Sequence, residues 1–154
     1  MRALEVQPED CQAALQLHGV LLALGREEEA HRYGELGLKR AEEALRQHPE
    51  WSRPAQLGAT VLAGMARREE AEAWIARAME IDPDENLVLY NAACTWALLG
   101  EADHALALLD KWAPKAGIEK KQWIKVDSDF DSLRDDPRFQ RLVEQIEESL
   151  PAKA

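Results

Sequence analysis

Three aspartates near the C-terminal end have the most distinctive ligand spacing in the sequence. Asp127, Asp129 and Asp131 match the first, third and fifth positions of a helix–loop–helix calcium site. Such a loop also needs a glycine at its sixth position, for a sharp turn, and a glutamate at its twelfth, which holds the ion with two oxygens. Those positions are Ser132 and Arg138 here. We therefore interpret the aspartates as a solvated acidic turn and predict no metal site.

The remaining nucleophiles, acids and metal ligands show no catalytic pattern. No ligand spacing relates the histidines to one another or to the two cysteines, Cys11 and Cys94. The sequence has no glycine-rich phosphate loop and no nucleophile elbow, and no carboxylate pair stands out among 29 acidic residues. We therefore predict that the chain is not an enzyme and uses no cofactor.

The composition is that of a folded helical protein with a strong negative charge. Hydrophobic residues make up 46% of the 154 residues, and alanine, leucine and glutamate dominate, which favours helices. The formal net charge of −10 repels phosphate groups, so we expect neither nucleic acid nor a membrane as a partner. Because the sequence has no long apolar run, no signal segment and no disulfide-like cysteine spacing, we expect a reducing, cytoplasmic location.

A short phrase occurs three times and organises the chain. It consists of alanine, four residues and proline, and the copies read ALEVQP, ALRQHP and AMEIDP. The second and third copies begin 34 residues apart, whereas 41 residues separate the first from the second. Proline cannot continue a helix, so each copy ends one helix pair before the next begins. Gly25 and Gly100 suit the tight turn inside a pair, because glycine adopts the left-handed conformation that follows a helix.

This period resembles that of the tetratricopeptide repeat family, in which a unit of about 34 residues forms two antiparallel helices. The alternation of small and large side chains at the helix crossing is clearest in residues 52–85, as Gly58, Ala59, Leu62, Ala71 and Ile75. A similar pattern follows in 86–117, and a weaker one precedes Pro49. The resemblance implies an all-α fold, a right-handed solenoid of antiparallel helix pairs with a C-terminal capping helix.

We expect a single domain over residues 1–154. Residues 2–10 are the end of a truncated repeat, 11–51 a repeat with an extended second helix, 52–85 and 86–117 two further repeats, and 118–150 the capping segment. Because the first repeat lacks its beginning, we expect the natural protein to continue upstream of Met1. The longer spacing extends the helix 27–47 by about 10 Å, and Gly34 and Gly37 within it indicate close packing or a local kink.

Two C-terminal phrases, NAACTWALLGEADHALALLDKW and DSDFDSLRDDPRFQRLVEQI, resemble the terminal segment of many bacterial multidomain regulators. In those proteins tetratricopeptide repeats end the chain behind a cyclase, kinase or DNA-binding domain. The resemblance implies a sensory or docking module of a larger bacterial regulatory protein. In the last segment, Asp136 before Pro137 predicts a helix start, and an apolar stripe from Phe139 to Leu150 predicts a helix that covers the end of the array.

In this family the first helices of the pairs line a concave groove where peptides bind. The resemblance therefore implies these partner-binding side chains: Gln12, Leu15, Arg53, Gln56, Thr60, Leu87, Tyr90, Asn91 and Cys94. Tyr90 and Arg53 are the expected anchors, because tyrosine and arginine are enriched at the centres of interfaces. The three first helices contain no lysine, so the two-lysine clamp of chaperone-binding members is absent.

The sequence leaves two classes of function open. The first is a protein-interaction module that binds an unidentified peptide or partner protein in the groove. The alternative is a self-association or intramolecular structural module, with the exposed N-terminal repeat edge as the surface of a homodimer. Among the tryptophans, we expect Trp96, Trp112 and Trp123 in the core, and Trp51 and Trp74 are candidates for exposed contacts.

Overall fold

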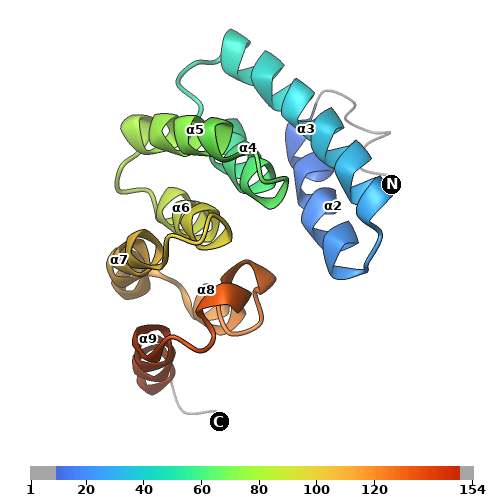
Figure 1. The fold of residues 1–154 in the computed structure, drawn as a ribbon. Helices are drawn as coiled ribbons and strands as arrows, with labels where there is room; N and C mark the ends of the chain where they lie inside the picture. The colour runs from blue at the N-terminus through green and yellow to red at the C-terminus, as the bar shows by residue number, and fades with distance from the viewer. Residues whose placement is uncertain (1–9, 150–154) are drawn as a thin grey trace.

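The computed structural model describes residues 10–149 and is all-helical over that range, with no strand (Figure 1). The predicted repeat end at 2–10 lies outside the described residues except for Asp10, and Leu150 lies outside them too. The helices are α2 (Cys11–Ala23), α3 (Glu27–Gln47), α4 (Ser52–Gly64), α5 (Arg68–Ile81), α6 (Asn86–Leu98), α7 (Ala102–Trp112), α8 (Ile118–Trp123) and α9 (Pro137–Glu148), with the 3₁₀ helices η1 (Ala113–Lys115) and η2 (Ser128–Leu133). None of the described helices combines the length and apolar character needed to cross a membrane.

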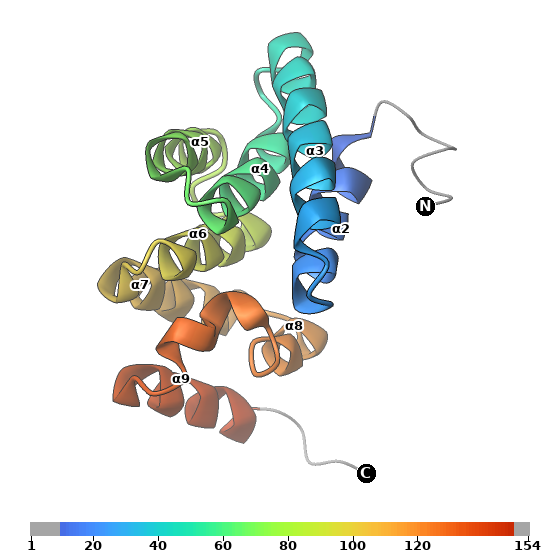
Figure 2. The same cartoon turned by 45° about the vertical axis from the view of Figure 1, so that its right-hand side comes forward.

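Consecutive helices pack as pairs, α2 against α3, α4 against α5 and α6 against α7. The first helices of the pairs also contact one another, α2 with α4 and α4 with α6, so the pairs stack in chain order (Figures 1 and 2). The chain is therefore helical and repeat-like. In such a stack each pair buries an apolar face against its neighbour.

One backbone turn recurs inside all three pairs. Gly25, Ala66 and Gly100 have φ values of 68°, 59° and 80°, each two residues after the end of the first helix. At each turn two amides donate to the last free carbonyls of the helix over 2.9–3.0 Å, for example Gly25 to Leu22 and Arg26 to Leu21. This pattern satisfies helix-end carbonyls that would otherwise lack a partner. The three positions are 41 and 34 residues apart, the same spacings as in the repeated phrase.

The turn between pairs recurs as well. His48 and Asp82 end α3 and α5 with φ and ψ of −131° and 74° in the first case and −135° and 74° in the second. Each of these residues directly precedes a proline: Pro49 follows His48, and Pro83 follows Asp82. A residue before proline avoids the helical region, so the prolines fix where each pair ends.

Two glycines allow α3 to approach its neighbours closely. A Cβ atom at Gly37 would lie 2.8 Å from the Leu15 side chain and 2.9 Å from the Leu15 backbone nitrogen. A Cβ atom at Gly34 would collide with the side chain of Met65 and lie 2.9 Å from Nδ1 of His18. Each glycine weakens the helix by about 1 kcal/mol, and the close contact with α2 and α4 offsets that loss. Their role in packing is therefore confirmed.

Replacing Gly37 with alanine should lower the free energy of unfolding by about 2 kcal/mol, although alanine favours a helix. The added methyl group must displace backbone atoms of α2, because Leu15 contributes its nitrogen to the contact. Gly19 is the matched control, because it lies inside α2 with nothing within 4 Å of the position of its Cβ. Gly19→Ala should instead stabilise the protein by up to about 1 kcal/mol. Urea unfolding of both variants tests this, and equal stabilisation would contradict the close approach of α3.

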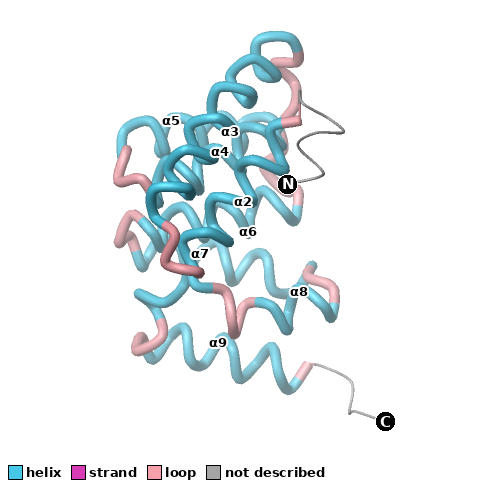
Figure 3. The backbone as a smooth tube through the Cα atoms, turned by 90° about the vertical axis from the view of Figure 1, so that its right-hand side faces the viewer, coloured by secondary structure: helices cyan, strands magenta, loops and turns pink. Residues whose placement is uncertain are grey.

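The C-terminal segment folds back onto α6 and α7 (Figure 3). η2 packs against α6, and α9 packs against α7 and α8. Phe130 of η2 and Phe139 of α9 are fully buried there, with ring centroids 5.8 Å apart. Asp136 caps α9 by accepting a hydrogen bond from the amide of Arg138 over 2.8 Å, as the sequence predicts. The segment thus extends the core of the repeat-like pairs.

The tryptophan predictions need correction. Trp112 is fully buried as expected, and Trp96 is half-buried. Trp123 was expected in the core, but 57% of its surface is exposed, because α8 is a single short helix at the edge of the C-terminal segment. Trp51 is exposed, whereas Trp74 is half-buried against the core.

Candidate functional site

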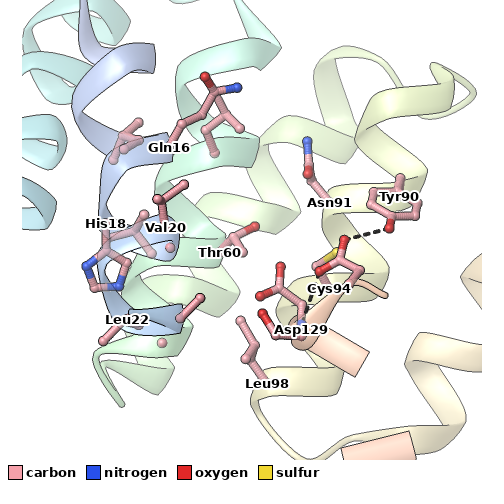
Figure 4. Close-up of a pocket in the computed structure, with 18 of the residues that line it drawn as sticks. Gln16, His18, Val20, Leu22, Thr60, Tyr90, Asn91, Cys94, Leu98 and Asp129 are labelled. Atoms are coloured by element: carbon pink, nitrogen blue, oxygen red, sulfur yellow. Dashed lines mark hydrogen bonds between the residues drawn. The ribbon is translucent and has the colours of Figure 1, made fainter. Parts of the chain in front are cut away.

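The first helices and the C-terminal segment enclose a groove of about 770 Å³ (Figure 4). α2 forms one wall, α6 and the residues from α8 to η2 form the other, and α4 lies between them. Six apolar side chains in this groove are at least 36% exposed: Val20, Leu22, Leu24, Leu98, Trp123 and Val126. Clustered apolar side chains in a concave surface are typical of a site that binds another molecule.

Seven of the nine side chains that the resemblance implied line this groove. They are Leu15, Arg53, Thr60, Leu87, Tyr90, Asn91 and Cys94. Gln12 is not part of the lining, although its side-chain oxygen accepts a hydrogen bond from Nε of Arg53 over 3.3 Å. Gln56 is 2% exposed and accepts a hydrogen bond from Asn91 over 2.6 Å, so it joins α4 to α6 and is closed to a partner.

Tyr90 is not the exposed anchor that the sequence predicts. Only 5% of it is exposed, and its ring packs on Trp112 and Phe130 with centroids 4.9 and 5.6 Å away. Its hydroxyl donates a hydrogen bond to Oδ2 of Asp127 over 2.6 Å, and burial raises its pKa. The reason for the error is that η2 folds over this part of α6 and covers a face that would otherwise be open. Tyr90 therefore holds the C-terminal segment in place.

Most of these apolar side chains were missed by the sequence analysis. Leu22 is one of the first-helix positions that the resemblance places in the groove, whereas Trp123 was expected in the core. Val20, Leu24, Leu98 and Val126 were not expected in the groove. One signal was present in α2, where residues 20–24 read VLLAL. A helix that buries only one face needs no such continuous apolar run, so some of these side chains must face outward.

Asp127 and Asp129 form an acidic pair at the α6 wall of the groove. Oδ2 of Asp127 also accepts a hydrogen bond from the Trp123 indole over 2.9 Å, and its Oδ1 caps η2 by accepting from the amide of Asp129 over 3.1 Å. Asp129 lies close by, with a carboxylate oxygen within 4.8 Å of both Asp127 and the Cys94 sulfur. Burial, followed by repulsion from Asp127, raises the pKa of Asp129 to about 6.

No cation within residues 10–149 forms an ion pair with either carboxylate. Arg134 is adjacent, but it donates to the backbone carbonyl of Asp127 over 2.7 Å and pairs with the Asp131 carboxylate. Lys120 also lines the groove, but within the described residues it forms no ion pair with Asp127 or Asp129. The two carboxylates therefore carry negative charge into the groove at neutral pH without compensation.

The cluster of Cys94, Asp127 and Asp129 fits a metal ion poorly. A cysteine binds metals as a thiolate, and burial raises the pKa of the Cys94 thiol well above its ordinary value, so the sulfur keeps its proton. Asp127 already accepts hydrogen bonds on both oxygens. Sequence reasoning did not foresee the approach of Cys94, because α6 and η2 meet only in the folded chain.

Replacing Asp129 with asparagine should stabilise the protein by about 2 kcal/mol near neutral pH. The pKa of Asp129 is about 6 in the folded chain against an ordinary 3.8, so the native state disfavours the ionised form. The resulting loss of stability sets in as the pH rises from about 4 to 6, and the neutral amide avoids it. The charges that face Asp129 are Asp127 and Asp131, with the neutral Cys94 thiol beside them.

Thermal unfolding at several pH values tests this prediction. The gain from Asp129→Asn should decrease steadily as the pH falls from 7 to 4. Asp135→Asn is the control, because Asp135 is exposed and the same charge is removed. An equal gain from both variants, or a gain that does not depend on pH, would contradict the burial of an uncompensated carboxylate.

A comparison with protein-family models found no match to this chain, and a comparison with curated proteins found none. Support for a function therefore comes from the repeated backbone geometry and from the groove.

Proposed function

We propose that this chain is a tetratricopeptide-type helical repeat domain that binds a segment of a partner protein in the groove between α2, α4, α6 and the C-terminal segment. We further propose that it serves as a docking module of a larger bacterial regulatory protein in the cytoplasm, and that it has no catalytic role. The observation that carries the docking function is the run of exposed apolar side chains along a concave surface.

The recurring turns support the tetratricopeptide assignment. Three intra-pair turns share one hydrogen-bond pattern, although Ala66 stands where the other two have glycine. A left-handed alanine is unfavourable by about 1–2 kcal/mol. The second pair keeps the turn although alanine is unfavourable there. This indicates that the packing of the two helices strongly constrains the angle between them. Such a constraint is expected where helix pairs of similar shape stack into a right-handed solenoid.

The composition of the groove supports docking of a protein segment. Leu22, Leu98 and Trp123 are 41%, 36% and 57% exposed, and they lie in the same concavity. Polar side chains such as Asn91 and Thr60 line the same groove (Figure 4). Apolar side chains with a few polar groups are what a peptide-binding groove presents, because apolar contacts supply affinity and polar groups fix register.

Self-association is the alternative function, and one observation favours it. Val20 in the last turn of α2 and Leu24, which follows that helix, are 55% and 64% exposed in the first helix pair of the described chain. Two such faces from different copies would bury apolar area against each other and produce a homodimer. This alternative uses the same α2 side chains, so it competes with a partner for part of the groove.

Light scattering and peptide selection on the full chain separate the two functions. Docking predicts a monomer across a wide concentration range and the selection of linear peptides from a random phage-displayed library. Self-association predicts a dimer at moderate concentration and no selected peptide. A dimer that Val20→Glu converts to a monomer, together with no peptide binding, would overturn the docking function.

A further inference from the structure

We propose that the groove receives a partner segment in which apolar side chains flank one lysine or arginine, and that this cation binds the Asp127 and Asp129 carboxylates. The inference rests on the docking function proposed above and specifies the chemistry of the partner.

The first step is the position of the acidic pair. Both carboxylates line the same groove as Leu98 and Val126, which are 36% and 72% exposed. Figure 4 shows Leu98 and Asp129 on the same side of the groove, opposite Val20 and Leu22 of α2. A ligand that covers these apolar side chains therefore also covers the carboxylates and removes water from them.

The second step is the effect of covering an uncompensated charge. A carboxylate that loses water without gaining a cation or hydrogen bonds is strongly destabilised. Asp127 already has three neutral donors, namely the Tyr90 hydroxyl, the Trp123 indole and the amide of Asp129. The groups beside Asp129 are the Cys94 thiol, which is a weak donor, and the carboxylates of Asp127 and Asp131, which repel its charge. A partner without a cation would thus be penalised at Asp129, whereas a lysine or arginine would gain charge-assisted hydrogen bonds there.

The third step concerns the cations of this chain. Arg53 and Lys120 are the cationic residues among the described groove residues. Arg53 donates to Gln12 over 3.3 Å, and neither residue pairs with the acidic pair. With a net charge of −10, the whole chain also attracts a basic segment from a distance. Charge complementarity therefore favours a basic residue from the partner over a neutral or acidic one.

A peptide selection followed by a double-mutant cycle tests the inference. Random linear peptides displayed on phage are selected on the immobilised full chain at neutral pH, and the selected sequences are synthesised. We expect them to share a lysine or arginine bracketed by apolar residues. Changing that cation to glutamine in the peptide should weaken binding about tenfold, as measured by calorimetry.

The protein side of the cycle uses Asp129→Asn, since Asp127 also caps η2 and accepts the hydrogen bond of the Tyr90 hydroxyl. This variant should weaken binding of the basic peptide by a similar factor, about tenfold. The affinity of the Asp129→Asn variant should then be the same for the selected peptide and for the peptide in which glutamine replaces the lysine or arginine. Asp135→Asn is the matched control and should leave both affinities unchanged, because Asp135 is exposed and is not part of the groove.

The possible outcomes separate this inference from the docking function. Selected peptides that bind the groove but lack a basic residue, or a cycle in which the two changes are independent, would overturn the inference and leave docking intact. Binding that Leu98→Glu does not weaken would place the peptide elsewhere and overturn both. A dimer whose own basic residue occupies the acidic pair would also overturn the inference, and light scattering with Asp129→Asn would reveal it.

Discussion

Replacing Phe130 with alanine should lower the free energy of unfolding by about 3–5 kcal/mol, the usual range for removing a fully buried aromatic ring. Phe130 has no exposed surface and joins three parts of the chain. Its ring meets Tyr90 of α6 edge-on at 5.6 Å and Phe139 of α9 at 5.8 Å. Alanine would leave a cavity where η2 packs on α6, so the C-terminal segment should loosen before the helix pairs do.

Urea unfolding followed by circular dichroism measures the loss, and hydrogen exchange locates it. Val126→Ala is the matched control in the same segment, because Val126 is 72% exposed and should change stability by less than about 0.5 kcal/mol. We expect faster exchange in η2 and α9 of the Phe130→Ala protein and little change in α2 and α3. A Phe130→Ala protein as stable as the control would show that the C-terminal segment does not cover α6.

Replacing Leu98 with glutamate should weaken binding of a selected peptide by about 10- to 100-fold. Leu98 is the last residue of α6 and one of the exposed apolar side chains of the groove, and a glutamate there adds a charge to the groove that Asp127 and Asp129 also line. An apolar ligand segment would have to remove water from that charge. The effect on folding should be small, because Leu98 is 36% exposed in the folded chain.

Leu36→Glu is the control for this loss of affinity. Leu36 is also a leucine that is 36% exposed on a helix, but it belongs to α3 and is not part of the groove. Both variants should unfold at similar urea concentrations, and only Leu98→Glu should bind the peptide more weakly. If the two variants bind alike, the groove is not the contact surface.

The helices and their ends were largely predictable from local sequence. Asp136 before Pro137 marks the start of α9, and Pro49 and Pro83 follow the ends of α3 and α5, because capping and proline sterics act over a few residues. The glycines in the tight turns were predictable for the same reason. The left-handed conformation of Ala66 in the second turn was not predictable in this way, because alanine rarely adopts it.

The candidate site was predictable only in part, because its shape depends on contacts distant in sequence. The first helices supply seven of the expected residues to the groove. The rest of the wall that α6 begins, however, comes from residues 120–129, whose position depends on how η2 meets α6. That contact buries Tyr90 and brings Asp129 beside Cys94, while Trp123 stays exposed at the edge of the C-terminal segment. No local pattern encodes these three results, because each depends on tertiary contacts between segments distant in sequence.

The tryptophan indole N–H resonances provide the most direct test of groove docking. Trp123 lies in the groove and donates its N–H to Asp127, whereas Trp51 is 48% exposed and lies outside the groove. Each resonance is assigned in a two-dimensional ¹⁵N–¹H spectrum by a single Trp→Phe variant, and a selected peptide is then titrated in. Docking in the groove predicts that the Trp123 resonance shifts and saturates with the binding curve while the Trp51 resonance stays in place. A Trp51 shift with an unmoved Trp123 resonance would contradict the groove as the binding surface.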